Sequence, residues 1–168
     1  QWSPDGMTVF WATAGMSGAM LEYRKKGTQE WLLYPVSHQN GILQRDSRMH
    51  VAHLAGLKEN TVYEYRLVNW APLLNKRKLT PSGKPLSFRT LTSKTKAFSF
   101  AVCSDIHSNT QILSKLMQLP GVRQTAFFVN LGDMLSSMSG PDAFFEGFLD
   151  LQTELYAKEK PLVFVRGN

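Results

Sequence analysis

The chain has 168 residues, of which 43% are apolar, and this is enough for one ordinary domain or two small ones. Its apolar runs fall well short of the roughly 18 residues that a membrane-spanning helix needs, so no transmembrane segment is predicted. The sequence begins Gln1-Trp2-Ser3-Pro4, which is neither a signal peptide nor an initiator methionine, and both a processed protein and a fragment would begin in this way.

The net charge of +6 is unevenly distributed along the chain. Residues 1–96 hold 14 Lys and Arg against six Asp and Glu, whereas residues 97–168 hold five against seven. A basic first half is either a solvated surface, with Lys76-Arg77-Lys78 as an exposed hairpin tip, or a means of steering an anionic substrate. The sequence contains no nucleic-acid-binding motif, so we expect no nucleic-acid partner.

Residues 1–92 have the pattern of an all-β domain. Short runs that are rich in β-branched and aromatic residues are separated by Gly, Asn and Pro, which is typical of a β-sandwich. The runs predict strands at residues 8–13, 20–24, 30–36, 50–54, 62–68 and 86–91.

One tyrosine in this domain stands in a recognisable context. Leu57 is followed at the fourth position by Thr61 and at the sixth by Tyr63, at the entry to a predicted strand. This pattern resembles the tyrosine corner of fibronectin type III-like modules, in which the hydroxyl bonds to the backbone upstream. The alternative is an ordinary half-buried strand tyrosine.

From residue 97, after a polar linker at 92–96, strands and helices alternate. Apolar runs at 98–103, 126–131 and 162–165 predict three strands, and the long crossovers favour a parallel sheet. The single cysteine, Cys103, lies inside the first run, where a small buried thiol is expected. Two apolar stripes predict the helices. The first includes Ile112, Leu113, Leu116, Met117 and Leu119, capped by Ser108 or Asn109 and ended by Pro120-Gly121, and the second runs from Phe144 to Tyr156.

Metal-ligand side chains directly follow each of these three apolar runs. In open α/β sheets, ligands bind at the ends of the strands, so three such ends predict one site built from successive loops. Each stretch alone would also fit a capped strand end or a turn. The stretches are Ser104-Asp105-Ile106-His107, Gly132-Asp133-Met134 and Arg166-Gly167-Asn168.

The residue types point to a metal centre. Asp105 and His107 are two positions apart, so in a strand-like segment both side chains point the same way and can reach one ion. Asp133 has two oxygens that can bridge two ions, and the amide oxygen of Asn168 can bind the second ion. Such ligands suit Mn, Zn or Fe. Two ions roughly 3.5 to 4 Å apart suit phosphate-ester hydrolysis, because they polarise the phosphoryl oxygens and lower the pKa of a water.

In this order, the three stretches resemble the first three blocks of the calcineurin-like metallophosphoesterases, which are Asp-x-His, Gly-Asp and Gly-Asn-His. Residues 1–92 are similar to the fibronectin type III-like domain that precedes the catalytic domain of purple acid phosphatases. The resemblance implies a fibronectin III-like β-sandwich over residues 1–92. It implies the first half of an α/β metallophosphoesterase domain, with four αββα layers when complete, over residues 97–168.

The resemblance also implies the roles of the site residues. Asp105 and His107 would bind the first of two divalent or trivalent metal ions, and Asp133 would bridge both. Asn168 would bind the second ion and contact the phosphate of the substrate. Purple acid phosphatases usually have a tyrosine ligand where this chain has Ser136, and often have glycine where it has His107. Both departures favour a colourless Mn, Zn or mixed centre of the broader class.

The resemblance further implies that this sequence is the N-terminal fragment of a longer protein. It stops at Asn168, before the next histidine and the later Gly-His-x-His block of the family. We therefore expect the fragment to expose an apolar sheet face, to bind metal poorly and to have little or no activity. Arg166, beside the site, is either a surface residue or a phosphate contact.

For the parent protein, the predicted function is hydrolysis of a phosphorylated small molecule or another phosphoester. One alternative is a nucleotidase or phosphodiesterase of the same fold. The other is a non-catalytic module that binds glycan or protein, with the four tryptophans as a carbohydrate platform. An extracytoplasmic location, periplasmic or secreted, is expected by resemblance only, and the sequence gives no oligomeric state.

Overall fold

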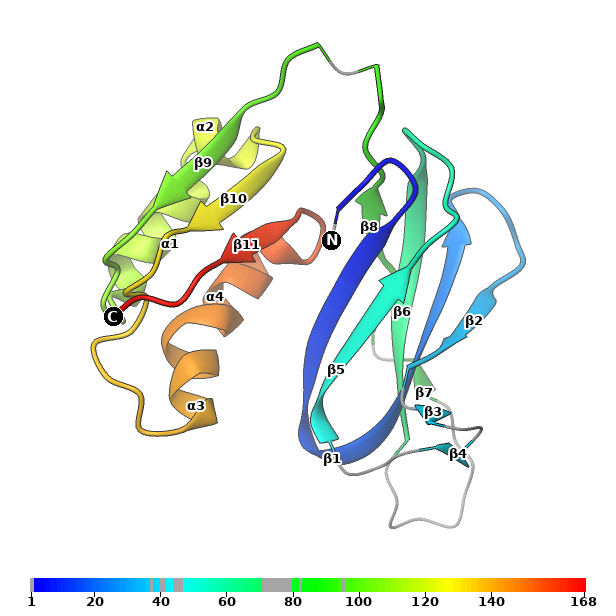
Figure 1. The fold of residues 1–168 in the computed structure, drawn as a ribbon, viewed down its shortest axis with the longest axis horizontal. Coiled ribbons are helices and arrows are strands. Elements are labelled where there is room, and N and C mark those ends of the chain that lie inside the picture. The colour runs from blue at the N-terminus through cyan, green and yellow to red at the C-terminus, as the bar shows by residue number, and fades with distance from the viewer. Residues whose placement is uncertain are drawn as a thin grey trace. The chain divides into compact units, whose positions relative to one another are not determined.

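The computed structural model describes residues 2–36, 38–39, 42–43, 47–70, 80–81, 83–94 and 96–168. The predicted hairpin tip Lys76-Arg77-Lys78 and the side chain of Trp70 lie outside this description. The chain divides into two compact units, Gln1–Lys94 and Thr95–Asn168 (Figure 1). Among the described helices, none has the length and apolar character needed to cross a membrane.

The first unit is built around a long antiparallel strand, β1 (Met7–Lys25). Its first part pairs with β5 (Ser47–Leu54), and its second part pairs with β6 (Val62–Trp70). The sequence predicts two strands here, but the backbone stays extended through the irregular register between Ala12 and Ser17. The other described strands of this unit are β2 (Leu32–Pro35), β3 (His38–Gln39), β4 (Ile42–Leu43), β7 (Thr80–Pro81) and β8 (Leu86–Arg89).

Alternate side chains of these strands bury into one apolar core, as a period of two requires. Leu21 and Ala52 are completely buried, and Trp11 belongs to the same core rather than to an exposed platform. The aromatic rings of Tyr63 and Phe88 stack with their centroids 5.7 Å apart. The unit is therefore an antiparallel β-structure with a shared core, and its assignment as a fibronectin III-like sandwich stays a proposal.

The hydroxyl of Tyr63 bonds to the backbone upstream, as the tyrosine-corner pattern predicts. The backbone N–H of Lys58 donates to the Tyr63 hydroxyl over 2.9 Å, while the ring is buried in the core. This bond fixes the crossover between β5 and β6, because the loop backbone has few other ways to satisfy that donor. The alternative of an ordinary strand tyrosine does not account for this contact.

Replacing Tyr63 with phenylalanine is expected to lower the free energy of unfolding by about 1–2 kcal/mol, because the Lys58 N–H loses its acceptor. Urea unfolding followed by circular dichroism measures the effect. Tyr34→Phe is the matched control, since no hydrogen bond of the Tyr34 hydroxyl is found among the described residues. Equal stability of the two variants would contradict this role of the hydroxyl.

His50 of β5 is a buried polar group beside the irregularity of β1. Its Nε2 atom lies 3.3 Å from the hydroxyl oxygens of both Thr13 and Ser17, and its ring lies 5.4 Å from that of Trp11. Burial lowers the pKa of His50 below its ordinary value of 6.5, because the imidazolium ion would lose its hydration.

The lowered pKa of His50 predicts a loss of stability in mild acid. Below pH 6.5 the unfolded chain binds a proton that the folded chain resists. The free energy of unfolding should therefore fall as the pH drops from 6.5 through the lowered folded-state pKa, and stay level above 6.5. Urea midpoints between about pH 5 and pH 8 test this. His50→Gln should flatten the profile, whereas His53→Gln, on an exposed residue of the same strand, should not.

The second unit contains a three-stranded parallel sheet, as predicted. The order is β11 (Leu162–Phe164), β10 (Phe127–Asn130) and β9 (Phe100–Cys103), with β10 in the centre. Each strand is only three or four residues long, so the chemistry-bearing loops begin directly after the paired segment. Because the strands are parallel, their three carboxyl ends meet at one edge.

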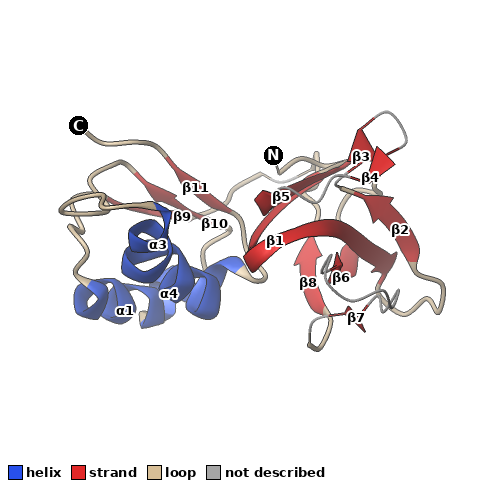
Figure 2. Ribbon diagram, turned by 90° about the horizontal axis from the view of Figure 1, so that it is seen from below, coloured by secondary structure: helices blue, strands red, loops and turns tan. Residues whose placement is uncertain are grey.

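Helices connect these strands and cover one face of the sheet (Figure 2). Helix α1 (Thr110–Gln118) begins at Asn109, whose side-chain oxygen accepts from the N–H of Ile112 over 3.0 Å. A short helix, α2 (Pro120–Arg123), follows it directly. The second predicted helix alternates between α and π turns, α3 (Pro141–Phe144), η1 (Phe145–Leu149), α4 (Asp150–Gln152) and η2 (Thr153–Ala157).

The two faces of this sheet differ in cover. On the helix side, Phe128 packs with Leu113, Met117 and Phe148, all of which are at most 1% exposed. On the other side, large apolar side chains remain exposed, and the rings of Phe100 and Phe127 stack at 5.0 Å. Among the described residues of the second unit itself, no element packs over this face, which agrees with the apolar sheet face that the sequence predicts.

Candidate metal centre

The loops after β9 and β10 lie against each other and continue the strand pairing beyond the sheet. The N–H of Leu131 donates to the carbonyl of Cys103 over 2.8 Å, and that of Asp105 donates to Gly132 over 3.2 Å. The N–H of His107 then donates to the carbonyl of Asp133 over 3.0 Å. These bonds hold the loop of Asp105 and His107 beside the loop of Asp133.

The backbone of both loops has an unusual conformation. In the described part of the chain, five non-glycine residues have a positive φ, and four of them are Asp105, His107, Ser108 and Asp133, with values from 48° to 59°. Left-handed backbone of this kind costs energy and gathers at functional sites, where the surrounding structure enforces it. The prediction that strand alternation gives Asp105 and His107 a common direction is therefore wrong. A tight turn directs them instead.

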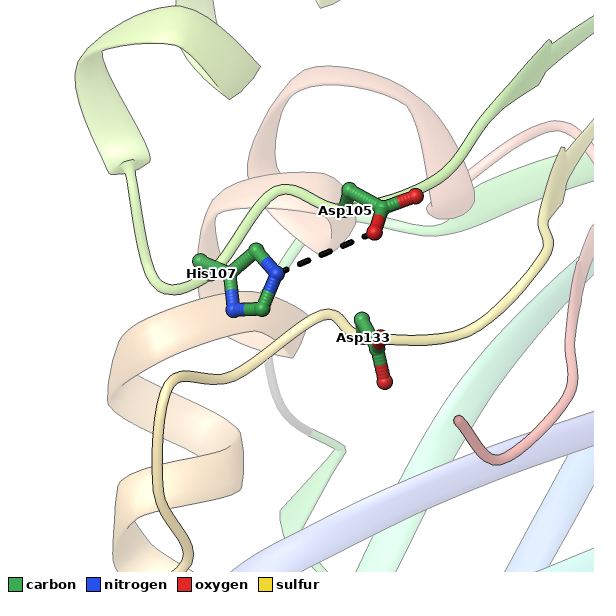
Figure 3. A group of neighbouring side chains, drawn as sticks. All are labelled: Asp105, His107 and Asp133. Atoms are coloured by element: carbon green, nitrogen blue, oxygen red, sulfur yellow. Dashed lines mark ion pairs between the residues drawn. The ribbon is translucent and has the colours of Figure 1, made fainter. Parts of the chain in front are cut away.

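The turn brings three ligand-type side chains together, as Figure 3 shows. One ligand atom from each of Asp105, His107 and Asp133 lies within 4.8 Å of the others. The Nε2 atom of His107 is 3.8 Å from the Oδ1 atom of Asp105, which is too long for a hydrogen bond. Both side chains are more than half exposed, so a direct ion pair would add little stability. The spacing leaves room for a cation between them.

Asn168 reaches the same place from the end of the loop after β11. Its backbone N–H donates to Oδ1 of Asp133 over 3.1 Å. Its side-chain oxygen faces only the carboxylate oxygens of Asp133, and turning the amide over would let its nitrogen donate to both, at 2.9 and 3.1 Å. Asn168 therefore lies against Asp133 in either orientation of its amide. The carboxylates of Asp105 and Asp133 and the imidazole of His107 are a donor set that fits a bound metal ion.

Two glycines allow these loops to approach so closely. Gly132 has a φ of 98°, and a Cβ atom added there would lie 2.8 Å from the Cα of Gly167. A Cβ added at Gly167 would overlap Asp133 itself, including its Cγ at 2.7 Å. The residue before Asn168 must therefore be glycine if Asp133 is to stay where it is. The sequence shows both glycines beside the ligands but not this contact.

Three serines hold the loops in place, a role that the sequence analysis does not assign to them. The Ser104 hydroxyl donates to the Asp105 carboxylate, while the Ser136 hydroxyl donates to the carbonyl of His107 over 2.7 Å. The Ser136 N–H donates to the hydroxyl of Ser108 over 3.3 Å. Ser136, at the position where the resemblance expects a tyrosine ligand, thus fixes the His107 backbone. For Ser104, the only indication in the sequence of such a role is its position directly before the predicted ligand Asp105. Arg166 is exposed.

A comparison with known families agrees with this geometry. Residues 98–168 match the family model for calcineurin-like phosphoesterases. These residues are therefore similar in sequence to calcineurin-like phosphoesterases. The match begins just before β9 and includes all four predicted ligands of the metal centre. A search among curated proteins gave no match.

Two solved structures resemble the entire chain. A purple acid phosphatase from yellow lupin (Lupinus luteus) seeds matches 99% of this chain and 33% of its own, with 14% identity and a TM-score of 0.67. The structure of PhoD matches 100% of this chain and 37% of its own, with 12% identity and a TM-score of 0.54. At such identities the similarity shows the fold alone. The chain thus spans about a third of the length of these two structures.

Proposed function

We propose that the protein hydrolyses phosphoric esters with the help of a dinuclear metal centre. One observation supports this above all. Asp105, His107 and Asp133 converge at the carboxyl edge of the parallel sheet, inside the segment that matches the calcineurin-like phosphoesterase family model. The loop backbones that hold them are strained into left-handed conformations, which a purely structural turn has little reason to keep.

The four ligands have distinct proposed roles. Asp105 and His107 bind the first ion, since they lie on one turn and their ligand atoms face each other across 3.8 Å. Asp133 bridges both ions, because one loop contacts it from each side, at His107 and at Asn168. Asn168 binds the second ion and contacts the phosphate. The metal ions supply Lewis-acid chemistry, which polarises a phosphoryl oxygen and activates water.

The proposed metals are Mn, Zn or Fe, because hard carboxylate and amide oxygens combine here with one imidazole. The Ser136 hydroxyl is engaged with the His107 carbonyl and offers no phenolate. A coloured iron–tyrosinate centre is therefore not part of the proposal.

Four side chains cannot complete the coordination of two metal ions, since zinc alone takes four ligands and larger cations take six. We propose that residues beyond Asn168 in the parent protein supply the missing ligands, and that this segment alone is inactive. The substrate is proposed to be a phosphorylated small molecule or another phosphoester. The first unit is proposed to be a fibronectin III-like module, and an extracytoplasmic location follows only from the resemblance.

The test uses protein made from the complete reading frame, dialysed against a chelator and reloaded with Mn²⁺ or Zn²⁺. We expect hydrolysis of p-nitrophenyl phosphate or its diester, and loss of hydrolysis after chelation. A panel of nucleotides, phosphomonoesters and phosphodiesters then separates a phosphatase from a nucleotidase or phosphodiesterase. No metal-dependent hydrolysis of any of them, with glycan or protein binding instead, would favour the non-catalytic alternative. Robust turnover by residues 1–168 alone would contradict the proposed need for further ligands.

A further inference from the structure

A small polar network is buried in the core of the second unit. Asn130 and Gln152 are both completely buried and exchange two hydrogen bonds. The Asn130 amide donates to the Gln152 oxygen over 3.2 Å, and the Gln152 amide donates back over 3.0 Å. The thiol of Cys103 also donates to the Asn130 oxygen over 3.2 Å. Cys103 packs against the apolar core of this unit, and no part of Asn130 or Gln152 is exposed to solvent.

Asn130 touches every element that leads into the metal centre. It is the last residue of the central strand β10, and Cys103 is the last residue of β9. The backbone carbonyl of Asn130 accepts from the N–H of Val165, just after β11. Its side chain reaches Gln152 at the end of α4. One residue therefore ties three strand ends and one helix together.

The residues that hydrogen-bond to one another at the strand ends are close in sequence to the predicted metal ligands. Cys103 precedes Asp105 by two residues, Asn130 precedes Asp133 by three, and Val165 precedes Asn168 by three. Over so few residues the chain has little freedom to absorb a shift, so a small movement of the strand ends moves the ligands. Hydrogen-bonded polar pairs have one preferred arrangement, whereas apolar side chains can slide past one another. The hydrogen-bonded network is therefore better suited to fixing the positions of the strand ends than to merely holding the helices against the sheet.

We propose that the buried pair of Asn130 and Gln152 is a positioning device for the metal centre. It fixes the relative placement of the three strand ends, and so the distances between Asp105, His107, Asp133 and Asn168. This inference rests on the proposed function for its metal-binding consequence, but not for its claim about loop positions.

The same unit offers a matched control. At the opposite end of the sheet, just before β10 begins, the hydroxyl of Thr125 lies 2.9 Å from that of Tyr156. Both residues are buried, at 6% and 5% exposure, and Tyr156 lies in η2, directly after α4. This second polar pair joins the same helical segment to the same strand, but far along the strand from the ligand loops. A general effect on packing would affect both pairs alike.

The principal variant is Gln152→Met, which keeps the length of the side chain and removes both hydrogen bonds to Asn130. Asn130→Ser, whose side chain is too short to reach Gln152, is the second variant, and Thr125→Val is the control. Mn²⁺ affinity is measured by calorimetry on protein from the complete reading frame. We expect both network variants to bind about 10-fold to 100-fold more weakly, and Thr125→Val to match the unsubstituted protein. Equal affinities in all four proteins would overturn the inference.

A readout without metal separates this inference from the proposed function. Amide hydrogen exchange of Asp105 and His107, whose N–H groups bond to the Asp133 loop, should be about tenfold faster in Gln152→Met and unchanged in Thr125→Val. If the unsubstituted protein binds no metal, the proposed function fails and the exchange rates still decide the inference. Exchange that is no faster in the network variants than in the control would refute it.

Discussion

Replacing Gly167 with alanine is expected to weaken metal binding by at least about a hundredfold, although only one methyl group is added. The methyl carbon would overlap the Asp133 carboxylate, and it would lie 2.7 Å from the carboxylate carbon. Asp133 cannot stay in place, because its backbone N–H is also in the way of the new atom. If Asp133 bridges two ions as proposed, a shift of about one ångström would spoil its fit to both, and such misplacement costs on the order of 10²-fold.

This expectation concerns space rather than backbone conformation. Gly167 is not among the described glycines with a positive φ, so alanine meets no intrinsic strain there. Gly121→Ala is the matched control, because a Cβ added to Gly121 meets no atom within 4 Å. Mn²⁺ titration and the circular dichroism spectrum should be measured for both variants in protein from the complete reading frame. A folded Gly167→Ala protein with the affinity of Gly121→Ala would show that Asp133 is not a ligand in this position.

Asp133→Asn is expected to lower the rate of phosphoester hydrolysis by about a thousandfold or more in protein from the complete reading frame. The loss of the negative charge between two cations removes several kcal/mol of charge stabilisation, and each step of about 1.4 kcal/mol is a factor of ten in rate. The fold should survive. The carbonyl that accepts from His107 belongs to the backbone, and the side-chain oxygen that remains in asparagine can still accept from the Asn168 N–H.

The control for this variant is Asp150→Asn, which removes the same charge from an exposed residue of α4. It should retain full activity. Steady-state kinetics and metal content by mass spectrometry distinguish loss of the ions from loss of rate with the ions retained. Activity of Asp133→Asn within a few-fold of Asp150→Asn would exclude Asp133 from the centre.

Features set by local chemistry were predictable from the sequence. Tyr63 bonds to Lys58, and Asn109 caps α1, because each contact depends on residues only a few positions apart. The parallel pairing of β9, β10 and β11 agrees with the length of the crossovers, which favours parallel strands joined by right-handed connections.

Features set by contacts between distant segments were not predictable. The turn that directs Asp105 and His107 depends on the Asp133 loop beside it, and nothing in Ser104-Asp105-Ile106-His107 indicates a positive φ. Ile112 and Leu119 continue the apolar stripe of α1, yet they are exposed, because only the part of the stripe around Leu113 and Met117 faces the sheet. Gln152 has no sequence signature, since its burial depends on a partner 22 positions away.

The central claim is that Asp105, His107, Asp133 and Asn168 hold metal ions together. A crystal structure of protein from the complete reading frame, grown with Mn²⁺ and analysed by anomalous scattering, tests it most directly. The account predicts two peaks roughly 3.5 to 4 Å apart, with Asp133 between them and Asn168 on the second. Peaks located elsewhere, or no peak at saturating Mn²⁺, would contradict it.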